Sequence, residues 1–218
     1  MVEKRKSIDF YNRLWRRKSG SSNSNINDGN RVDVAAQLLP NGHRLLDLGC
    51  GDGRLAQVLG STFQEYYGLD IAASAVKAAT RVGVKAQVWD LDSPPYPFPQ
   101  GHFQAIAALD VIEHVWDPCQ IMREISRLLC PGGVAVVAVP NIRYWPRLVQ
   151  IVLKSNVPPT SDDTGAYDGG HIHYFAAGNL KSLLKSAGLR PEAICGVFGV
   201  KWFIGLRSPG LVIRAHKL

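Results

Sequence analysis

Short apolar runs alternate with amphipathic stretches along most of this chain, and the alternation predicts strands that alternate with helices. Residues 103–109 form a nearly continuous apolar run, which is typical of a strand covered on both faces of a parallel sheet. The expected strands are 44–48, 66–69, 84–91, 103–109, 134–139, 193–200 and 211–216. The expected helices are 30–39, 54–59, 72–82, 118–129, 141–159 and 177–186. The pattern therefore predicts an α/β fold.

The first expected strand runs into a glycine-rich loop. Gly49, Gly51 and Gly53 lack the Cβ atoms that would keep a ligand away from the backbone. A dinucleotide-binding loop has the spacing G-x-G-x-x-G, whereas the third glycine here comes one residue earlier. Asp47 and Asp52 would repel a pyrophosphate, but they suit a ligand that carries an ammonium and a sulfonium. The alternative is an ordinary turn between strand and helix that binds nothing.

A second acidic residue closes the next strand. Asp70 follows the apolar segment 66–69, about 20 residues after the first glycine. A carboxylate at this place can accept hydrogen bonds from both hydroxyls of a ribose. The alternative is an aspartate that faces solvent at a strand end.

Five segments in this order resemble the successive motifs of the class I S-adenosylmethionine-dependent methyltransferases. They are 47–53, 68–70, 89–91, 110–115 and 129–133. The resemblance covers residues 31–189 and implies a Rossmann-like, mostly parallel sheet of seven strands in the order 3-2-1-4-5-7-6, with the last strand antiparallel and helices on both faces. It also implies a single methyltransferase domain over 29–218, with a substrate-side insertion at about 141–176.

Two branches of this superfamily compete. Residues 139–141, Trp145, Arg147 and the segments 167–168 and 171–173 resemble the MetW-like branch. Residues 110–115 are closer to the small-molecule O-methyltransferases of ubiquinone biosynthesis. The expected function is methyl transfer to a small-molecule acceptor, at a hydroxyl. The alternatives are a MetW-like accessory protein of methionine biosynthesis and an RNA methyltransferase.

The resemblance also implies which residues bind S-adenosyl-L-methionine, of which S-adenosyl-L-homocysteine is the product. Arg31 corresponds to an arginine that binds the cofactor carboxylate, Asp90 to the residue that accepts the adenine N6 protons, and the Leu91 N–H to the donor that meets N1. For Asp90 the alternative is an aspartate that starts a turn. The full expected set is Arg31, Asp47, Gly49, Cys50, Gly51, Gly53, Asp70, Ile71, Asp90, Leu91, Leu109 and Asp110.

Three histidines are candidates for the base that a hydroxyl acceptor needs. His114 follows the fourth strand, and alternation places His171 and His173 on one side if their segment is extended. A structural role for each imidazole is the alternative. Asp110, Glu113 and His114 resemble a divalent-metal set proposed in ubiquinone-type enzymes, which would make a magnesium ion conceivable, but we expect no metal requirement.

Composition narrows the expected setting. The 218 residues are 46% hydrophobic, yet they include no apolar run long enough to span a bilayer and no signal-peptide pattern, so we expect a cytoplasmic protein. Its four cysteines are scattered and read as reduced thiols.

The net charge is +7, with much of the excess in the first 20 residues. Residues 1–28 are expected to be a basic, partly mobile segment, in which Tyr11 and Trp15 either face the substrate or dock on the sheet. A solvated basic arm is favoured over contact with nucleic acid. A small-molecule acceptor is the expected partner, and monomer and homodimer both stay open.

Overall fold

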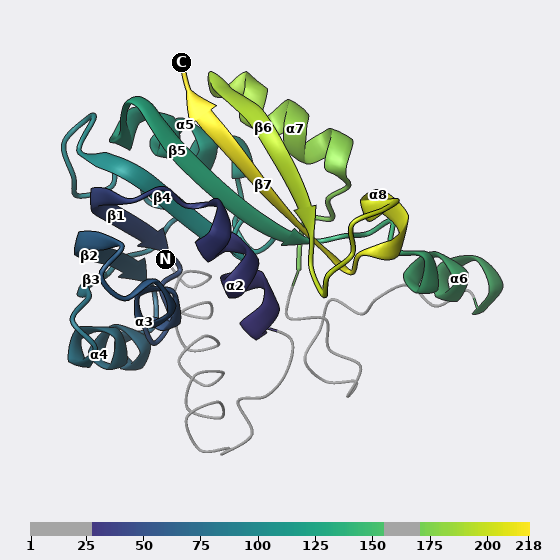
Figure 1. Ribbon diagram of the computed structural model, residues 1–218, viewed down its shortest axis with the longest axis horizontal. Coiled ribbons are helices and arrows are strands. Elements are labelled where there is room, and N and C mark those ends of the chain that lie inside the picture. The colour runs from purple at the N-terminus through teal and green to yellow at the C-terminus, as the bar shows by residue number, and fades with distance from the viewer. Residues whose placement is uncertain (1–27, 155–170) are drawn as a thin grey trace.

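A computed structural model of the chain describes residues 28–154 and 171–218. Their strands form one sheet in the order β3-β2-β1-β4-β5-β7-β6 (Figure 1). Only β7 runs antiparallel to its neighbours within this sheet. The strands are β1 (Gly42–Leu48), β2 (Phe63–Asp70), β3 (Lys85–Val88), β4 (Phe103–Leu109), β5 (Leu129–Pro140), β6 (Leu189–Gly196) and β7 (Gly210–Lys217). The predicted fold class, strand order and reversed strand are confirmed.

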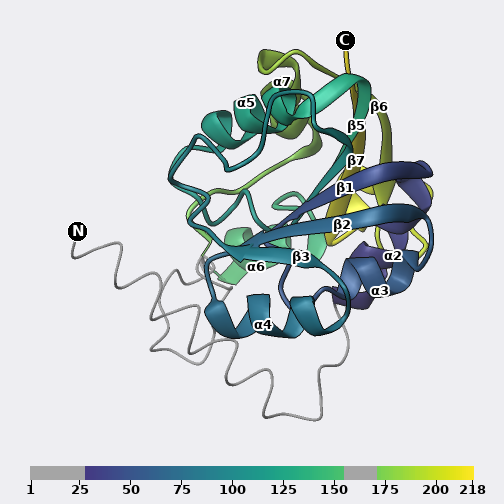
Figure 2. The same cartoon turned by 90° about the vertical axis from the view of Figure 1, so that its left-hand side faces the viewer.

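Helices cover both faces of the sheet (Figure 2). Apolar side chains of α5 and α7 pack on one face, and those of α2 and α3 on the other. The helices are α2 (Asp28–Leu38), α3 (Arg54–Leu59), α4 (Ala73–Arg81), α5 (Pro118–Leu128), α6 (Trp145–Lys154), α7 (Ala177–Ser186) and α8 (Ile204–Arg207). The central strands are therefore buried from both sides, as their apolar sequences require.

The alternation of side chains in β5 shows how one strand serves both faces. Val134 and Val136 point to the side of α2 and α3, whereas Ala135 and Val137 point to the side of α5 and α7. The sequence suggests that the glycines at 132 and 133 form a break before the strand. In the structure they lie within β5 instead. The register with β4 shifts at this point, where a β-bulge accommodates the extra residues.

Several predicted boundaries or environments are wrong. β6 begins at Leu189 rather than at residue 193. Its first residues are polar and lack a strand pattern, but they form a strand because they pair with β7. β3 ends at Val88. The proline-rich connection 94–99 is not wholly superficial, since the Tyr96 side chain is buried in the core.

By its sequence, the apolar run at 200–204 could be an interface or core. Trp202 and Phe203 are among the most exposed apolar side chains of the described residues. This run is therefore not core.

Several predictions fall on residues that are not described. The N-terminal segment with Tyr11 and Trp15 lies outside the described ranges, as does most of the polar part of the insertion. Within the described ranges, none of the helices has the length and apolar character needed to cross a bilayer.

Candidate cofactor and acceptor site

The carboxyl ends of β1, β2 and β4 meet at one edge of the sheet. Leu48 lies opposite Leu69 on β2 and opposite Ala108 on β4. The glycine loop, Asp70 and the Leu109–Asp110 step are the next residues along each strand. The structure therefore brings together three segments that are far apart in the sequence, at the edge where open α/β sheets bind ligands.

Asp70 fastens the glycine loop to β2. Its Oδ2 accepts a hydrogen bond from the Gly51 N–H at 3.0 Å, and its Oδ1 accepts one from the Ala72 N–H at 2.8 Å. The Gly49 N–H donates to the Leu69 carbonyl at 2.7 Å. Asp70 is buried. The alternative of a solvent-facing aspartate is therefore wrong.

Two positions in the loop require glycine. Gly49 has φ +70°, and a Cβ there would lie 2.5 Å from Val111 Cγ2. Gly53, which precedes α3, has φ +82°, and its Cβ would lie 2.7 Å from Val82 Cγ2. Both conformations are disfavoured for residues with a side chain, and the space is already filled. The loop is thus shaped by close packing beneath it.

Cys50 faces away from the backbone of the loop. A Cβ at Gly68 would lie 2.6 Å from Cys50 Sγ, so the thiol rests against β2. Burial, together with the negative charges of Asp47 and Asp70, raises the pKa of the thiol. The Cys50 side chain is therefore part of the core beneath the loop, and a role in binding would fall to its backbone.

Asp47 is a buried acid at the end of β1. Burial raises the pKa of its carboxyl from 3.8 to about 8, and the nearby Asp70 contributes in the same direction. Asp52, by contrast, is exposed. A buried carboxyl that resists ionisation is suited to a cationic ligand, because the ligand supplies the charge that favours the ionised form.

The Asp90 segment forms a tight turn just beyond β3. Asp90 Oδ1 accepts a hydrogen bond from the Asp92 N–H at 3.0 Å, and the Asp90 carbonyl accepts one from the Ser93 N–H at 2.9 Å. The Trp89 N–H donates to the Asp70 carbonyl at 2.9 Å, which places the turn beside the end of β2. Asp90 does start a turn, as its alternative predicts, and the turn lies at the same edge of the sheet as Asp70 and the glycine loop.

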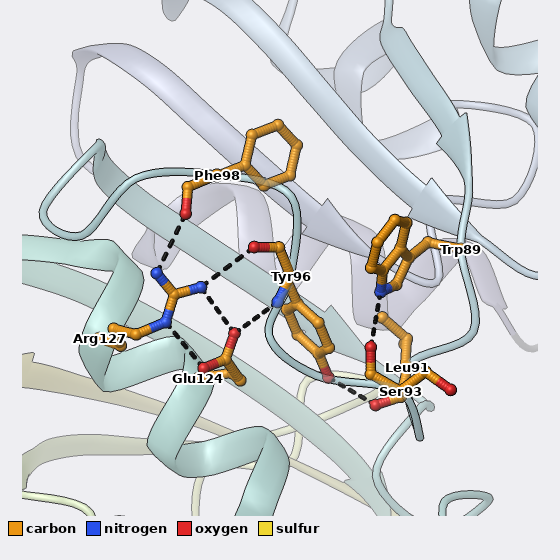
Figure 3. A network of polar contacts seen from close by, with 7 residues as sticks. All are labelled: Trp89, Leu91, Ser93, Tyr96, Phe98, Glu124 and Arg127. Atoms are coloured by element: carbon orange, nitrogen blue, oxygen red, sulfur yellow. Dashed lines mark hydrogen bonds and ion pairs between the residues drawn. The ribbon is translucent and has the colours of Figure 1, made fainter.

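A polar network from α5 holds the chain that follows this turn (Figure 3). Arg127 donates to the carbonyls of Phe98 and Tyr96 at 3.0 and 3.2 Å, and its guanidinium also bonds both carboxylate oxygens of Glu124. Glu124 accepts the Tyr96 N–H at 2.7 Å, and the Tyr96 hydroxyl donates to the Leu91 carbonyl at 2.9 Å. The network therefore connects α5 to the Asp90–Leu91 turn.

We expect Arg127→Gln to lower the free energy of unfolding by about 2–3 kcal/mol, because two carbonyls and the largely buried Glu124 carboxylate lose a charged donor. Burial opposes ionisation of Glu124, but the hydrogen bonds from Arg127 and the Tyr96 N–H, together with the charge of Arg127, outweigh it and lower the pKa of the carboxyl. Arg123→Gln, on the exposed side of α5, is the matched control and should change stability by less than about 0.5 kcal/mol. Urea unfolding of both variants measures the difference, and equal effects would contradict the role of the network.

Arg31 and Asp110 form an ion pair across the sheet edge. Arg31 Nη1 lies 3.1 Å from Asp110 Oδ2, and a Cβ at Gly210 would lie 2.8 Å from Arg31 Nε. Arg31 Nε is buried with no hydrogen-bond partner among the described residues. Asp110 has φ +53°, which turns the chain sharply after β4. Arg31 is thus at the predicted edge, and binding of the cofactor carboxylate stays a prediction.

His114 and His171 come together over Glu113. The two rings lie 4.8 Å apart, and His171 Nε2 is 3.9 Å from Glu113 Oε1. Glu113 is fully buried, and neither carboxylate oxygen has a hydrogen-bond partner among the described residues. Burial raises the pKa of this carboxyl well above its usual value, and the charge of Asp110 adds to the shift.

The backbone at Glu113 anchors the segment that carries the other histidines. The Glu113 carbonyl accepts hydrogen bonds from the N–H groups of Ile172 and His173, at 2.9 and 3.1 Å. The His173 ring lies nearer Phe175, with ring centres 6.3 Å apart. The pairing of His114 with His171 is thus observed, whereas His173 meets the cluster through its backbone.

The cluster could also hold a cation. Glu113, His114 and His171 each offer a ligand atom within 4.8 Å of the others, which is the one such group found in the described residues. The set implied by the family resemblance has Asp110 in place of His171, but Asp110 pairs with Arg31 instead.

Comparison with protein families decides the class. A family model described as a methyltransferase domain matches residues 8–194, which is most of the chain. The chain belongs to the methyltransferase domain family. This methyltransferase takes S-adenosyl-L-methionine as its cofactor, and the buried carboxyl of Asp47 and the bare loop backbone fit that cationic ligand.

Individual relatives agree with this assignment. The methyltransferase is 28% identical over 171 residues to a "Probable S-adenosylmethionine-dependent methyltransferase" of Mycolicibacterium smegmatis, covering 77% of this chain but only 61% of that protein. It is 28% identical to a "Ubiquinone biosynthesis O-methyltransferase" of Xanthomonas axonopodis, covering 78% of this chain and 72% of the relative. A SAM-dependent methyltransferase structure from Thermotoga maritima has a TM-score of 0.67 at 19% identity, covering 97% of this chain and 96% of that one, which shows the shared fold.

Sequence reasoning missed two structural features of the candidate site. The Glu124–Arg127 pair was not identified, although a proline-rich segment with few N–H donors needs polar partners from elsewhere. The contact of His171 with Glu113 was also missed, because nothing local links residues so far apart in the chain.

Proposed function

We propose that this methyltransferase transfers a methyl group to a hydroxyl of a small-molecule acceptor. The observation that carries the proposal is the cluster of His114 and His171 over the buried Glu113, at the edge that also holds the glycine loop. The name of the Xanthomonas relative, an O-methyltransferase of ubiquinone biosynthesis, supports a hydroxyl on a small molecule.

The cofactor would lie against the glycine loop. Asp70 would accept hydrogen bonds from the ribose hydroxyls, Asp47 would face the ammonium group, and the Asp90–Leu91 turn would meet the adenine. Arg31 would reach the cofactor carboxylate with the donors that its pair with Asp110 leaves. When bound, the cofactor supplies a methyl group on a sulfonium, already activated for displacement.

The protein's own part is to position the acceptor and receive its proton. One of the two paired imidazoles, that of His114 or that of His171, would take the single proton from the acceptor hydroxyl as the methyl group is transferred. The carboxyl of Glu113 would hold the His171 ring in place. The N–H groups of residues 172 and 173 bond to the Glu113 carbonyl, and this anchoring would keep the His171 ring over the site and help to exclude water.

The proposal is tested with His114→Asn and His171→Asn on a panel of phenols and other hydroxyl acceptors. Each variant should lose about 10²–10⁴-fold in kcat, since a general base contributes that much, while cofactor affinity stays unchanged. His43→Asn, a half-exposed histidine at the start of β1, is the control. Wild-type rates in both cluster variants would contradict the proposal. Loss of wild-type activity in EDTA, restored by Mg²⁺, would reassign the cluster to a cation.

For Asp70→Ala we expect cofactor affinity to fall by about 1–3 kcal/mol, or roughly 5- to 150-fold, through lost charged hydrogen bonds. Part of the loss would come from the Gly51 N–H, which is then left without its carboxylate partner. Isothermal titration with S-adenosylhomocysteine measures the affinity. Asp52→Ala, an exposed aspartate of the same loop, should bind as the wild type does. An Asp70→Ala protein with unchanged affinity would refute the ribose assignment.

A further inference from the structure

The connection between β6 and β7 presents large apolar side chains to solvent. Trp202 and Phe203 are 74% and 78% exposed, which is far more than soluble proteins usually allow for aromatic residues grouped together. Leu206, on α8, is also exposed. The connection lies at the same carboxyl edge of the sheet as the glycine loop, but next to β6 and β7, and β4 and β5 separate it from β1.

A second apolar segment leaves the same end of the sheet. On α6, Val152 and Leu153 are 74% and 76% exposed. The two segments share one anchor, because the Asn141 side chain donates to the carbonyls of Gly205 and Ser208 at 3.1 and 2.8 Å. Figure 1 shows α6 and α8 projecting together from the end of the molecule where β5 leaves the sheet. We call residues 141–154, which include α6, and the connection 197–209 together the α6–α8 surface.

The backbone holds an aromatic ring of this surface outward at a cost. Phe203 has φ +49°, in the left-handed region that bulky side chains rarely adopt. Such a conformation is strained, so it persists only where the surrounding structure enforces it. The exposed ring is therefore a fixed feature of the loop.

The charge of the α6–α8 surface has a single sign. Its two segments, 141–154 and 197–209, contain five basic residues and no acidic residue: Arg143, Arg147, Lys154, Lys201 and Arg207. Arg143, Lys201 and Arg207 are exposed. An occupant of this surface must therefore be anionic as well as apolar.

This charge argues against two occupants from the protein itself. A second copy would bring the same five cations against these. The N-terminal segment is also basic, with seven basic and two acidic residues among the first 20. Both pairings would place like charges together without a compensating anion.

We propose that the α6–α8 surface binds the face of an anionic lipid bilayer. Tryptophan and phenylalanine flanked by lysine and arginine are the residues that enter the boundary between headgroups and acyl chains. The aliphatic side chains of α6 and α8 favour lipid over nucleic acid, because they gain nothing by stacking on bases. The attachment is peripheral and reversible, and it does not depend on the proposed function.

The test is sedimentation of the full chain with vesicles of phosphatidylcholine, alone or with about 30% phosphatidylglycerol. Binding is expected only to the anionic vesicles and should weaken with salt. We expect Trp202→Ala/Phe203→Ala and Lys201→Gln/Arg207→Gln each to reduce partitioning by roughly tenfold or more, since each pair removes two contacts.

Matched controls lie away from the surface. Leu218→Ala removes a side chain that is also 78% exposed, but at the end of β7, on the opposite edge of the sheet. Lys181→Gln/Lys185→Gln removes two exposed cations from α7. Both controls should bind vesicles as the wild type does, and melting temperatures establish that every variant is folded.

Three results would overturn the proposal. One is the absence of binding to anionic vesicles, and another is equal binding by the surface variants and the controls. The third is a wild-type dimer in sedimentation velocity that Trp202→Ala/Phe203→Ala converts to a monomer without any lipid binding, which would assign the surface to a second copy.

Discussion

Replacing Asp47 with asparagine is expected to make the ligand-free protein more stable and, at the same time, weaker in binding its cofactor. Burial raises the pKa of the Asp47 carboxyl to about 8. At neutral pH and above, folding of the wild type therefore requires either that this carboxyl takes up a proton or that its charge is buried, and both lower the stability. Asparagine has nearly the same shape and no charge. We expect a gain on the order of 2 kcal/mol in the free energy of unfolding at pH 8.

The pH dependence follows from the direction of this shift. Between the unfolded pKa near 3.8 and the folded pKa of about 8, the folded protein binds a proton that the unfolded chain releases. The contribution of Asp47 to stability therefore falls as the pH rises through this range, and the penalty is complete above it. Unfolding of the two proteins from pH 5 to 8 should show their stabilities diverging, and parallel curves would contradict the burial of this charge.

Cofactor binding should respond in the opposite direction. An ammonium group beside Asp47 favours the ionised carboxyl, so wild-type affinity should rise between pH 6 and 8 with release of a proton. Asp47→Asn should bind about 10- to 100-fold more weakly at pH 8, because a hydrogen bond between charged groups is lost. Asp52→Asn changes an exposed carboxylate of the same loop and should alter neither property. Titrations in buffers of different ionisation enthalpy measure the proton release.

Gly49→Ala should be among the most damaging single-methyl changes in the chain. The left-handed backbone at φ +70° costs about 1–2 kcal/mol for alanine, and the new Cβ would meet Val111 Cγ2 at 2.5 Å. We expect the free energy of unfolding to fall by about 3 kcal/mol or more, with a loss of cofactor binding as the loop shifts. Chemical unfolding and calorimetric titration measure the two effects.

Gly188→Ala separates strain from collision. Gly188 also has a positive φ, of +75°, but nothing lies within 4 Å of the Cβ position. Its cost should therefore be the backbone term alone, about 1–2 kcal/mol. Val111→Ala in the Gly49→Ala background should restore part of the stability, since the collision is then removed. If Gly49→Ala and Gly188→Ala cost the same, the packing of Val111 against the loop does not matter.

Local patterns in the sequence were enough to predict the sheet and the glycine loop. Each depends on a short run of residues, such as the apolar strand before Gly49 or the acid at the end of β2. The order of strands came from the family resemblance, and the structure confirms it. The start of β6 could not be predicted, because a segment containing Pro191 and Glu192 becomes a strand only through its partner β7.

The candidate site was predicted less completely, because its decisive contacts join distant residues. Arg31 meets Asp110, and His171 meets Glu113, through folding rather than through any shared motif. Burial is equally non-local: the sequence shows that Asp47 is acidic, but not that its carboxyl is enclosed. The MetW-like branch, the boundaries of the domain and the role of each site residue stay predictions.

The position of Cys50 has a consequence for measuring the movement of the loop. Its sulfur is enclosed between the glycine loop and β2, whereas Cys119 lies on the surface. An electrophile can therefore reach Cys50 only in molecules whose loop has lifted away from Gly68. The rate at which an electrophile modifies Cys50 therefore measures how often the glycine loop opens.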